Sequence, residues 1–158
     1  MFREMRRFKQ KLEQAECIEI LKNELRGVLS VLGDDGYPYG MPLDHFYDEE
    51  TGKLYFHGAS EGHRVDAVRA CDKVSYCVYD AGYRKEGDWA LNIKSVIVFG
   101  RMSELTDIAE VESVCRKLSH KFTNDEEYID NDVAKNLKYV KVFALTPEHI
   151  SGKLVNES

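Results

Sequence analysis

The amino-acid sequence predicts a mainly β protein of the α+β class, an antiparallel barrel of about six strands with peripheral helices. Six segments show the alternating apolar pattern, or the β-branched and aromatic content, that is typical of strands. Most of them are separated by turns of hairpin length, which join antiparallel neighbours. Helical periodicity is confined to the start of the chain, the segment after the third strand and the segment before the last strand. A doubly wound α/β fold is the less favoured alternative, because the first three strands lack helical crossovers.

Length and composition are those of one globular domain. The 158 residues are enough for a single substantial core, so we treat 1–158 as one domain. The chain is 43% hydrophobic and 32% charged, which is ordinary for a globular protein, and its net charge of −6 argues against a nucleic-acid partner. The sequence has neither a run of about 18 apolar residues nor a secretory signal, so we expect a cytoplasmic protein without membrane contacts.

The cysteines and histidines do not form a metal-binding motif. No pair has Cys-x-x-Cys spacing, which favours reduced, buried thiols over a zinc site or a disulfide framework. We assign no metal role to His120 or His149, which have no neighbouring ligands in the sequence. The four thiols belong to Cys17, Cys71, Cys77 and Cys115.

The first third of the chain is predicted to form a helix followed by a β-hairpin. An amphipathic helix is predicted from about Lys9 to just before Gly27. The apolar run Val28–Leu32 and the aromatic-rich segment Tyr37–Tyr47 then form a β-hairpin around a Gly-Asp-Asp-Gly turn. The two prolines of the second strand, Pro38 and Pro42, remove ladder donors, so this strand is expected at an edge, with main chain free to meet a ligand or a second subunit.

A strand, a short helix and another strand follow. Lys53–His57 is the third strand, residues 62–71 form one short helix, and Lys73–Tyr79 alternates apolar and polar residues as the fourth strand. The glycine-containing segment Asp80–Asp88 is a surface loop that could act as a lid, with Trp89 at its end.

The last third contains the longest strand signal. Ile93–Leu105 is interrupted by Gly100, where a bulge or bend would let the strand curl around a barrel. A capped helix runs from Asp107 to about Lys121, and a short helix is expected near Val133–Leu137. The final strand, Tyr139–Leu145, is expected to stop at Thr146-Pro147.

The segment from Tyr55 to Arg64 predicts a phosphate site. A strand ends there in small residues, and a helix begins with basic ones. Backbone N–H groups at a helix N-terminus carry partial positive charge, and glycine lets a ligand approach the main chain closely. Positive charge in a first helical turn is locally unfavourable unless an anion compensates it, so Arg64 favours a ligand over a solvated surface residue. We expect the pocket to suit a phosphorylated cofactor.

These residues resemble a known family. The chain resembles the flavin-binding split-barrel proteins related to pyridoxamine 5'-phosphate oxidase, and within them the 5-nitroimidazole-resistance-like branch. The resemblance runs from about Met5 to Lys153. It rests on the order and spacing of five short segments: Arg6-Arg7, Gly36–Tyr39 with Pro42, Tyr55–Arg64, Lys94–Gly100 and Ser151–Lys153.

The resemblance implies a split barrel that forms a homodimer and binds FMN at the subunit interface. The strand that would line the isoalloxazine edge comprises Tyr39, Gly40, Met41, Pro42, Leu43 and Asp44. The ribityl chain and phosphate would be flanked by His57, Gly58 and Ala59. The phosphate itself would be bound by Gly62, His63 and Arg64, the last being Lys in most of the family. The ring would be approached from the neighbouring strand by Ser95 and Val96.

The leading functional hypothesis is an FMN-dependent oxidoreductase that takes a hydride from NAD(P)H and passes electrons to a small planar acceptor, such as a 5-nitroimidazole. The flavin carries out such chemistry, so no catalytic triad is required. His57 is the candidate catalytic residue, as a hydrogen-bond donor or proton source, although a histidine there is also common as a hydrogen-bonded core residue. Trp89 is a candidate wall of the substrate pocket, with a core position as its alternative.

Three alternatives stay open. Pyridoxamine 5'-phosphate oxidase activity is less favoured, because the chain lacks a C-terminal arginine cluster: beyond Lys141 only Lys153 is basic. A non-catalytic protein could hold flavin or haem for storage, sensing or sequestration. A ligand-free structural dimer would predict that Arg64→Glu changes nothing.

Overall fold

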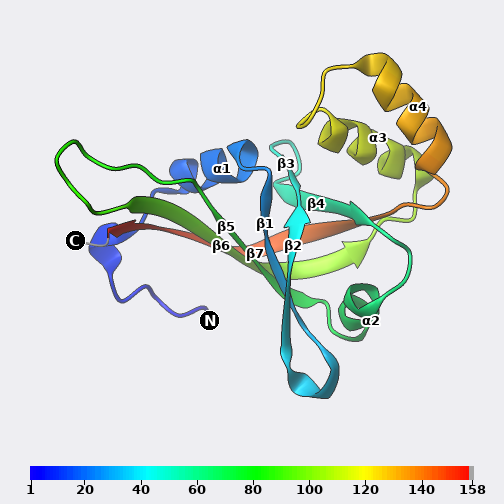
Figure 1. The fold of residues 1–158 in the computed structure, drawn as a ribbon. Coiled ribbons are helices and arrows are strands. Elements are labelled where there is room, and N and C mark those ends of the chain that lie inside the picture. Colours follow the sequence, from blue (N-terminus) through cyan, green and yellow to red (C-terminus); the bar gives the residue numbers. More distant parts are fainter. Residues whose placement is uncertain (157–158) are drawn as a thin grey trace.

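One antiparallel sheet of seven strands forms the centre of the molecule. The computed structural model describes residues 1–156. The strands are ordered β2-β1-β5-β6-β7-β4-β3, and the sheet curls into a half-barrel (Figure 1). The predicted fold class, a mainly β split barrel with peripheral helices, is confirmed. The strands are β1 (Arg26–Leu32), β2 (Pro38–Asp44), β3 (Phe46–Asp48), β4 (Lys53–Gly58), β5 (Lys73–Tyr79), β6 (Asn92–Glu104) and β7 (Lys141–Asn156).

The seventh strand arises because the predicted strand 37–47 is two strands. The chain leaves β2 at His45, whose side chain is completely buried, and re-enters the sheet as β3. β2 pairs with β1 at one edge, whereas β3 pairs with β4 at the other. β2 and β3 follow each other in the chain but lie at opposite edges of the sheet, so the sheet must curl. His45 lies at the link between these two edge strands. Pro38 and Pro42 lie on the edge strand β2, as predicted.

The pairing of β6 with β7 confirms the predicted bend and corrects the predicted end of the last strand. The register shifts between Phe99 and Gly100, and a Cβ at Gly100 would collide with the backbone oxygen of Thr146. Pro147 lies opposite Gly100, at the irregularity. Proline has no backbone N–H to donate to the ladder, and it is tolerated at such an irregularity. β7 therefore continues through Pro147 to Asn156 instead of stopping at Leu145.

The helices lie at the periphery of the sheet, and two differ from expectation. α1 begins at Gln14 and not near Lys9, because Glu13 and Glu16 form a capping box. α4 is longer than the predicted 133–137, because Asp125 accepts from the Tyr128 N–H and caps a full helix. The helical segments are η1 (Phe8–Gln10), α1 (Gln14–Asn23), η2 (Asp34–Gly36), α2 (His63–Ala70), α3 (Ile108–Ser119) and α4 (Glu126–Asn136).

Two apolar clusters pack on opposite faces of β4. Leu54 and Phe56 belong to the main core inside the half-barrel, which α1 and α2 help to enclose. Tyr55 belongs to a smaller cluster with Val111 of α3 and Val142 of β7. Because side chains alternate along a strand, β4 separates the barrel interior from the space under α3 and α4 (Figure 1).

The outer face of the sheet carries exposed apolar side chains. The register aligns these side chains on three adjacent strands, where they come from Val28 and Leu32 of β1, Tyr79 of β5, and Ile97 and Phe99 of β6. The four cysteines are unpaired, as predicted, but only Cys17 is fully buried. None of the helices within residues 1–156 is long and apolar enough to cross a bilayer.

Candidate functional site

Arg64 lies at the end of β4 in a space that glycine provides. Its guanidinium lies so close to Gly58 that a Cβ there would overlap the Arg64 Nη2 atom. The guanidinium carbon also lies 5.8 Å from the centroid of the Phe143 ring, at the open end of the main core. β4, β7 and the first turn of α2 therefore hold this cation in place.

The Arg64 guanidinium is half-buried, and within residues 1–156 it forms no ion pair. Burial lowers the pKa of this guanidinium below its usual value, with the nearby Tyr39 hydroxyl opposing that shift. No described side chain caps the N-terminus of α2, which starts after Gly62 at a φ of 125°. Two sources of positive potential, the guanidinium and the N-terminus of α2, meet here. Asp66 lies in the same first turn, but no ion pair within residues 1–156 joins it to Arg64.

His63 has a partner of its own. Its ring stacks on Tyr39, with centroids 4.2 Å apart and planes at 12°, and its Nε2 atom lies 3.4 Å from the backbone nitrogen of Asp34. The imidazole therefore links α2 to the β1–β2 hairpin. Gly58, Gly62, His63, Arg64 and Tyr39 are brought together at one end of the half-barrel.

The remaining predicted residues of β2 lie along the edge strand next to this end. Met41 and Leu43 pack against the main core, like Tyr39, whereas Gly40 and Pro42 alternate to the outer face and are exposed. Asp44 forms an ion pair with Arg26. A ligand on β2 would thus meet backbone groups and small side chains, as expected for the edge of a flat ring.

Within a single chain, Ser95 and Val96 do not lie near Arg64. Ser95 pairs with Lys153, whereas Glu104, nine residues further along β6, pairs with Phe143 beneath Arg64. Nine residues at roughly 3.3 Å each separate the two positions by about 30 Å. Val96 is completely buried in the main core, so it offers only backbone.

Trp89 is exposed on the loop between β5 and β6, where its carbonyl oxygen accepts from Arg84 Nε at 3.0 Å. This loop extends away from α2 and from the α3–α4 pair (Figure 1). Trp89 and Ser95 can meet the Arg64 end only if a second copy of the chain supplies them.

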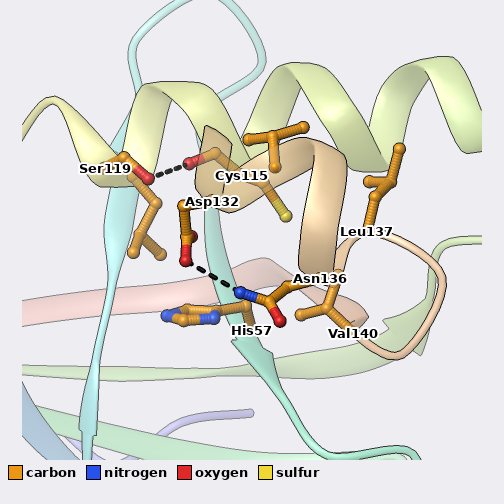
Figure 2. A pocket seen from close by; sticks show the side chains of 9 residues that line it. His57, Cys115, Ser119, Asp132, Asn136, Leu137 and Val140 are labelled. Atoms are coloured by element: carbon orange, nitrogen blue, oxygen red, sulfur yellow. Dashed lines mark hydrogen bonds between the residues drawn. The ribbon is translucent and has the colours of Figure 1, made fainter. Parts of the chain in front are cut away.

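His57 faces the other side of β4. Its side chain borders a cavity of about 310 Å³ between β4, the α3–α4 pair and the segment that leads from α4 into β7 (Figure 2). Partial burial lowers the pKa of the imidazole, the Asp44 carboxylate opposes this shift, and the Arg64 cation adds to it. The rest of the lining comes from Cys115, Leu118, Ser119, Asp132, Val133, Asn136, Leu137 and Val140.

The lining of this cavity escaped prediction. Cys115 and Ser119 are four residues apart on α3, and Asp132 and Asn136 are four apart on α4, so each pair shares a helix face. That spacing is visible in the sequence, but it carries meaning only once α4 is known to begin at Glu126 and to pack on α3.

A buried polar network at His45 was also missed. His45 Nε2 lies 2.7 Å from the Leu21 carbonyl oxygen, and its Nδ1 lies 2.9 Å from the Tyr76 hydroxyl. Burial, with a smaller contribution from the Lys121 cation, lowers the pKa of His45 to about 4. The Lys121 ammonium donates to the carbonyl oxygens of Glu24 and His45, both at 2.7 Å.

Comparison with known proteins gives a consistent picture. The family model for pyridoxamine 5'-phosphate oxidase matches residues 13–154. No curated protein matches the sequence. Among solved structures, a candidate 5-nitroimidazole antibiotic resistance protein from Bacteroides thetaiotaomicron superposes with a TM-score of 0.78 at 15% identity, over 92% of this chain and 87% of that one.

Two further structures have the same fold. An FAD-binding protein from Mesorhizobium loti is 24% identical over 92% of this chain and 97% of that one, with a TM-score of 0.66. The flavocytochrome Anf3 from Azotobacter vinelandii is 20% identical over 96% of this chain and 72% of that one, with a TM-score of 0.79.

Proposed function

The chain belongs to the pyridoxamine 5'-phosphate oxidase family, and we propose that it binds FMN with the phosphate at Arg64. One observation carries the proposal: a half-buried guanidinium without an ion pair among the described residues lies at an uncapped helix N-terminus. A phosphate would satisfy both with charge-assisted hydrogen bonds. The flavin names of the Mesorhizobium loti and Azotobacter vinelandii proteins support a flavin as the ligand.

The remaining contacts follow from the position of the phosphate. Gly62 leaves the main chain open to the phosphate, and Gly58 makes room for the Arg64 guanidinium. Ala59 would flank the ribityl chain, and the edge strand Tyr39–Asp44 lies next to them for the ring. Residues at the far end of β6 would complete the site from a second copy, so we propose a homodimer. The exposed apolar side chains on the outer face of β1, β5 and β6 are suited to such an interface.

We propose that the bound protein is an oxidoreductase that accepts electrons from NAD(P)H and passes them to a small planar acceptor. The flavin supplies the hydride and electron transfer when bound. This chain's residues would hold the phosphate, position the ring along β2 and exclude water at the dimer interface. The name of the Bacteroides thetaiotaomicron protein supports a nitroaromatic acceptor.

His57 stays a candidate for proton transfer, although within one chain it faces the α3–α4 cavity. His57→Ala tests this role: a protein that retains FMN but loses turnover supports it, and unchanged turnover contradicts it.

The visible absorption spectrum of the purified protein tests the proposal, recorded after FMN is added and the excess removed. We expect flavin bands near one equivalent per chain, and bleaching by NADH or NADPH followed by reoxidation with a nitroimidazole over many turnovers. Flavin bands without turnover would support a carrier. A colourless protein would contradict flavin binding.

A further inference from the structure

The cavity beside His57 has the features of a small-molecule site. Its volume of about 310 Å³ is at the lower end of ligand pockets, which span about 300–1,000 Å³. One wall is apolar and comes from Leu118, Val133, Leu137 and Val140. The lining also carries polar groups, with the Asp132 and Asn136 side chains directed toward His57 (Figure 2).

This cavity lies on the other face of β4 from the proposed phosphate site. His57 alternates with Phe56 and Gly58, which face the main core and Arg64. Tyr55, two residues before His57, packs with α3 in the second apolar cluster. The strand itself therefore separates the two sites, so that a ligand in the cavity need not contact the flavin phosphate.

Hydrogen-bond acceptors dominate the polar side. The Asn136 amide donates to Asp132 Oδ1 at 2.8 Å, which leaves Asp132 Oδ2 and the Asn136 carbonyl oxygen free to accept. The Ser119 hydroxyl donates to the Cys115 carbonyl oxygen at 2.9 Å, which leaves the Ser119 oxygen free to accept. A ligand that fits these groups must present several donors.

The lining of the cavity carries a formal negative charge. Asp132 is the lining residue with a formal charge near neutral pH, since burial lowers the pKa of His57 and raises the pKa of the Cys115 thiol. The Asp132 carboxylate raises the pKa of both groups by its charge, so its field reaches across the cavity. Asp130 of the same helix is paired with Arg116 of α3, so the charge that a ligand in the cavity would meet is that of Asp132.

We propose that this cavity binds a small planar organic cation, such as an amidine or a protonated heteroaromatic amine, independently of the flavin. The flat body would lie against the apolar wall. The N–H groups would donate to Asp132, Asn136 and Ser119, and the positive charge would pair with the Asp132 carboxylate. The cavity admits a single ring with a short substituent.

Two probes of matched shape and opposite charge test the proposal: benzamidine, a planar amidinium, and benzoate, a planar carboxylate. Each is titrated into the folded protein at neutral pH, while the His57 ring resonances, assigned with His57→Gln, are followed by NMR. We expect saturable shifts of His57 with benzamidine and binding of benzoate weaker by roughly tenfold or more. Equal binding of the two probes, or no shift at His57, would overturn the proposal.

Two variants locate the charge. Asp132→Asn keeps the shape and the hydrogen bond to Asn136 but removes the carboxylate, and we expect it to weaken benzamidine by roughly tenfold. Glu127→Gln is the matched control on the same helix, because Glu127 is exposed and does not line the cavity. Equal effects of the two substitutions would show a diffuse surface attraction and contradict the site.

Independence from the flavin is measured separately. Saturating FMN and the Arg64→Gln substitution should each leave the benzamidine affinity within about twofold, since β4 lies between the sites. Displacement of benzamidine by FMN would show that the cavity is part of the flavin site and would overturn the inference. Failure of FMN binding with intact benzamidine binding would count against the proposed function alone.

Discussion

Two partly buried cations in this protein have opposite surroundings. Lys121 lies where α3 meets the end of α1, and its ammonium donates to two carbonyl oxygens. Arg64 lies at the end of β4 and has no ion pair within residues 1–156. Desolvating a cation costs free energy in both places. Two hydrogen bonds offset this cost at Lys121, whereas at Arg64 the described residues offer the face of the Phe143 ring and no anion. The Lys121 cation is therefore structural, and the Arg64 cation marks a ligand site.

The largest expected effect comes from Arg64→Gln. Removing the charge should weaken FMN binding by roughly 1,000-fold, since two charge-assisted hydrogen bonds are lost. The melting temperature of the ligand-free protein should not fall, because a cation without an ion pair is being removed. FMN fluorescence quenching and thermal unfolding measure the two quantities. Arg64→Lys is the matched control and should retain most of the affinity, because lysine keeps the positive charge that pairs with the phosphate. A destabilised Arg64→Gln protein with normal FMN affinity would show that Arg64 is structural and would contradict its role in binding the phosphate.

Lys121→Met should behave in the opposite way. It leaves the carbonyl oxygens of Glu24 and His45 without their donor, at a cost of about 3 kcal/mol in the free energy of unfolding. FMN affinity of the folded fraction should be unchanged. Urea unfolding measures the loss. The surface residue Lys22, which pairs with Glu19 and Glu49, gives a control variant, Lys22→Met, with little expected change in the free energy of unfolding. Equal losses in the two variants would contradict a structural role for Lys121.

The neighbouring His45 predicts a pH dependence of stability. Its pKa is about 4 in the folded state, whereas an unfolded histidine titrates near 6.5. The unfolded chain thus binds more protons between these values, so stability is fully present above pH 6.5 and decreases as the pH falls toward 4. The expected loss between pH 7.5 and pH 5 is about 2 kcal/mol. Urea unfolding at the two pH values measures it, and the same slope in His45→Gln would rule out His45 as the source.

Gly58→Ala should give the smallest effect. The added Cβ would occupy the space of the Arg64 guanidinium, whose flexible end can move aside. We therefore expect FMN binding to weaken by roughly tenfold, with little change in stability. Unchanged FMN affinity in Gly58→Ala would contradict a phosphate held by the Arg64 guanidinium beside Gly58.

Much of the fold was predictable because local patterns were strong. Val74, Tyr76 and Val78 alternate inward along β5, and Gly100 marks the irregularity of β6. The errors fell where tertiary structure overrides local signals. Pro147 does not end β7, because it lies opposite the irregularity at Gly100, and His45 divides an aromatic segment into strands on opposite edges.

The candidate site was predictable in part for the same reason. Charge at the start of α2 and the neighbouring glycines pointed to Arg64 before its surroundings were known. The stacking of His63 on Tyr39 depends on how α2 packs against the β1–β2 hairpin, which sequence spacing does not encode. The opposite facing of His57 and Gly58 follows from strand alternation and could have been predicted, whereas the packing of Arg64 against Gly58 depends on the placement of α2.

The most direct test of the central claim compares FMN with riboflavin, which lacks the phosphate, by fluorescence titration of the wild-type protein and Arg64→Gln. We predict that the wild-type protein binds FMN at least 100-fold more tightly than riboflavin, and that this preference disappears in Arg64→Gln. Equal affinity of the wild-type protein for the two flavins, or an undiminished preference in Arg64→Gln, would contradict the assignment of Arg64 as the phosphate-binding residue.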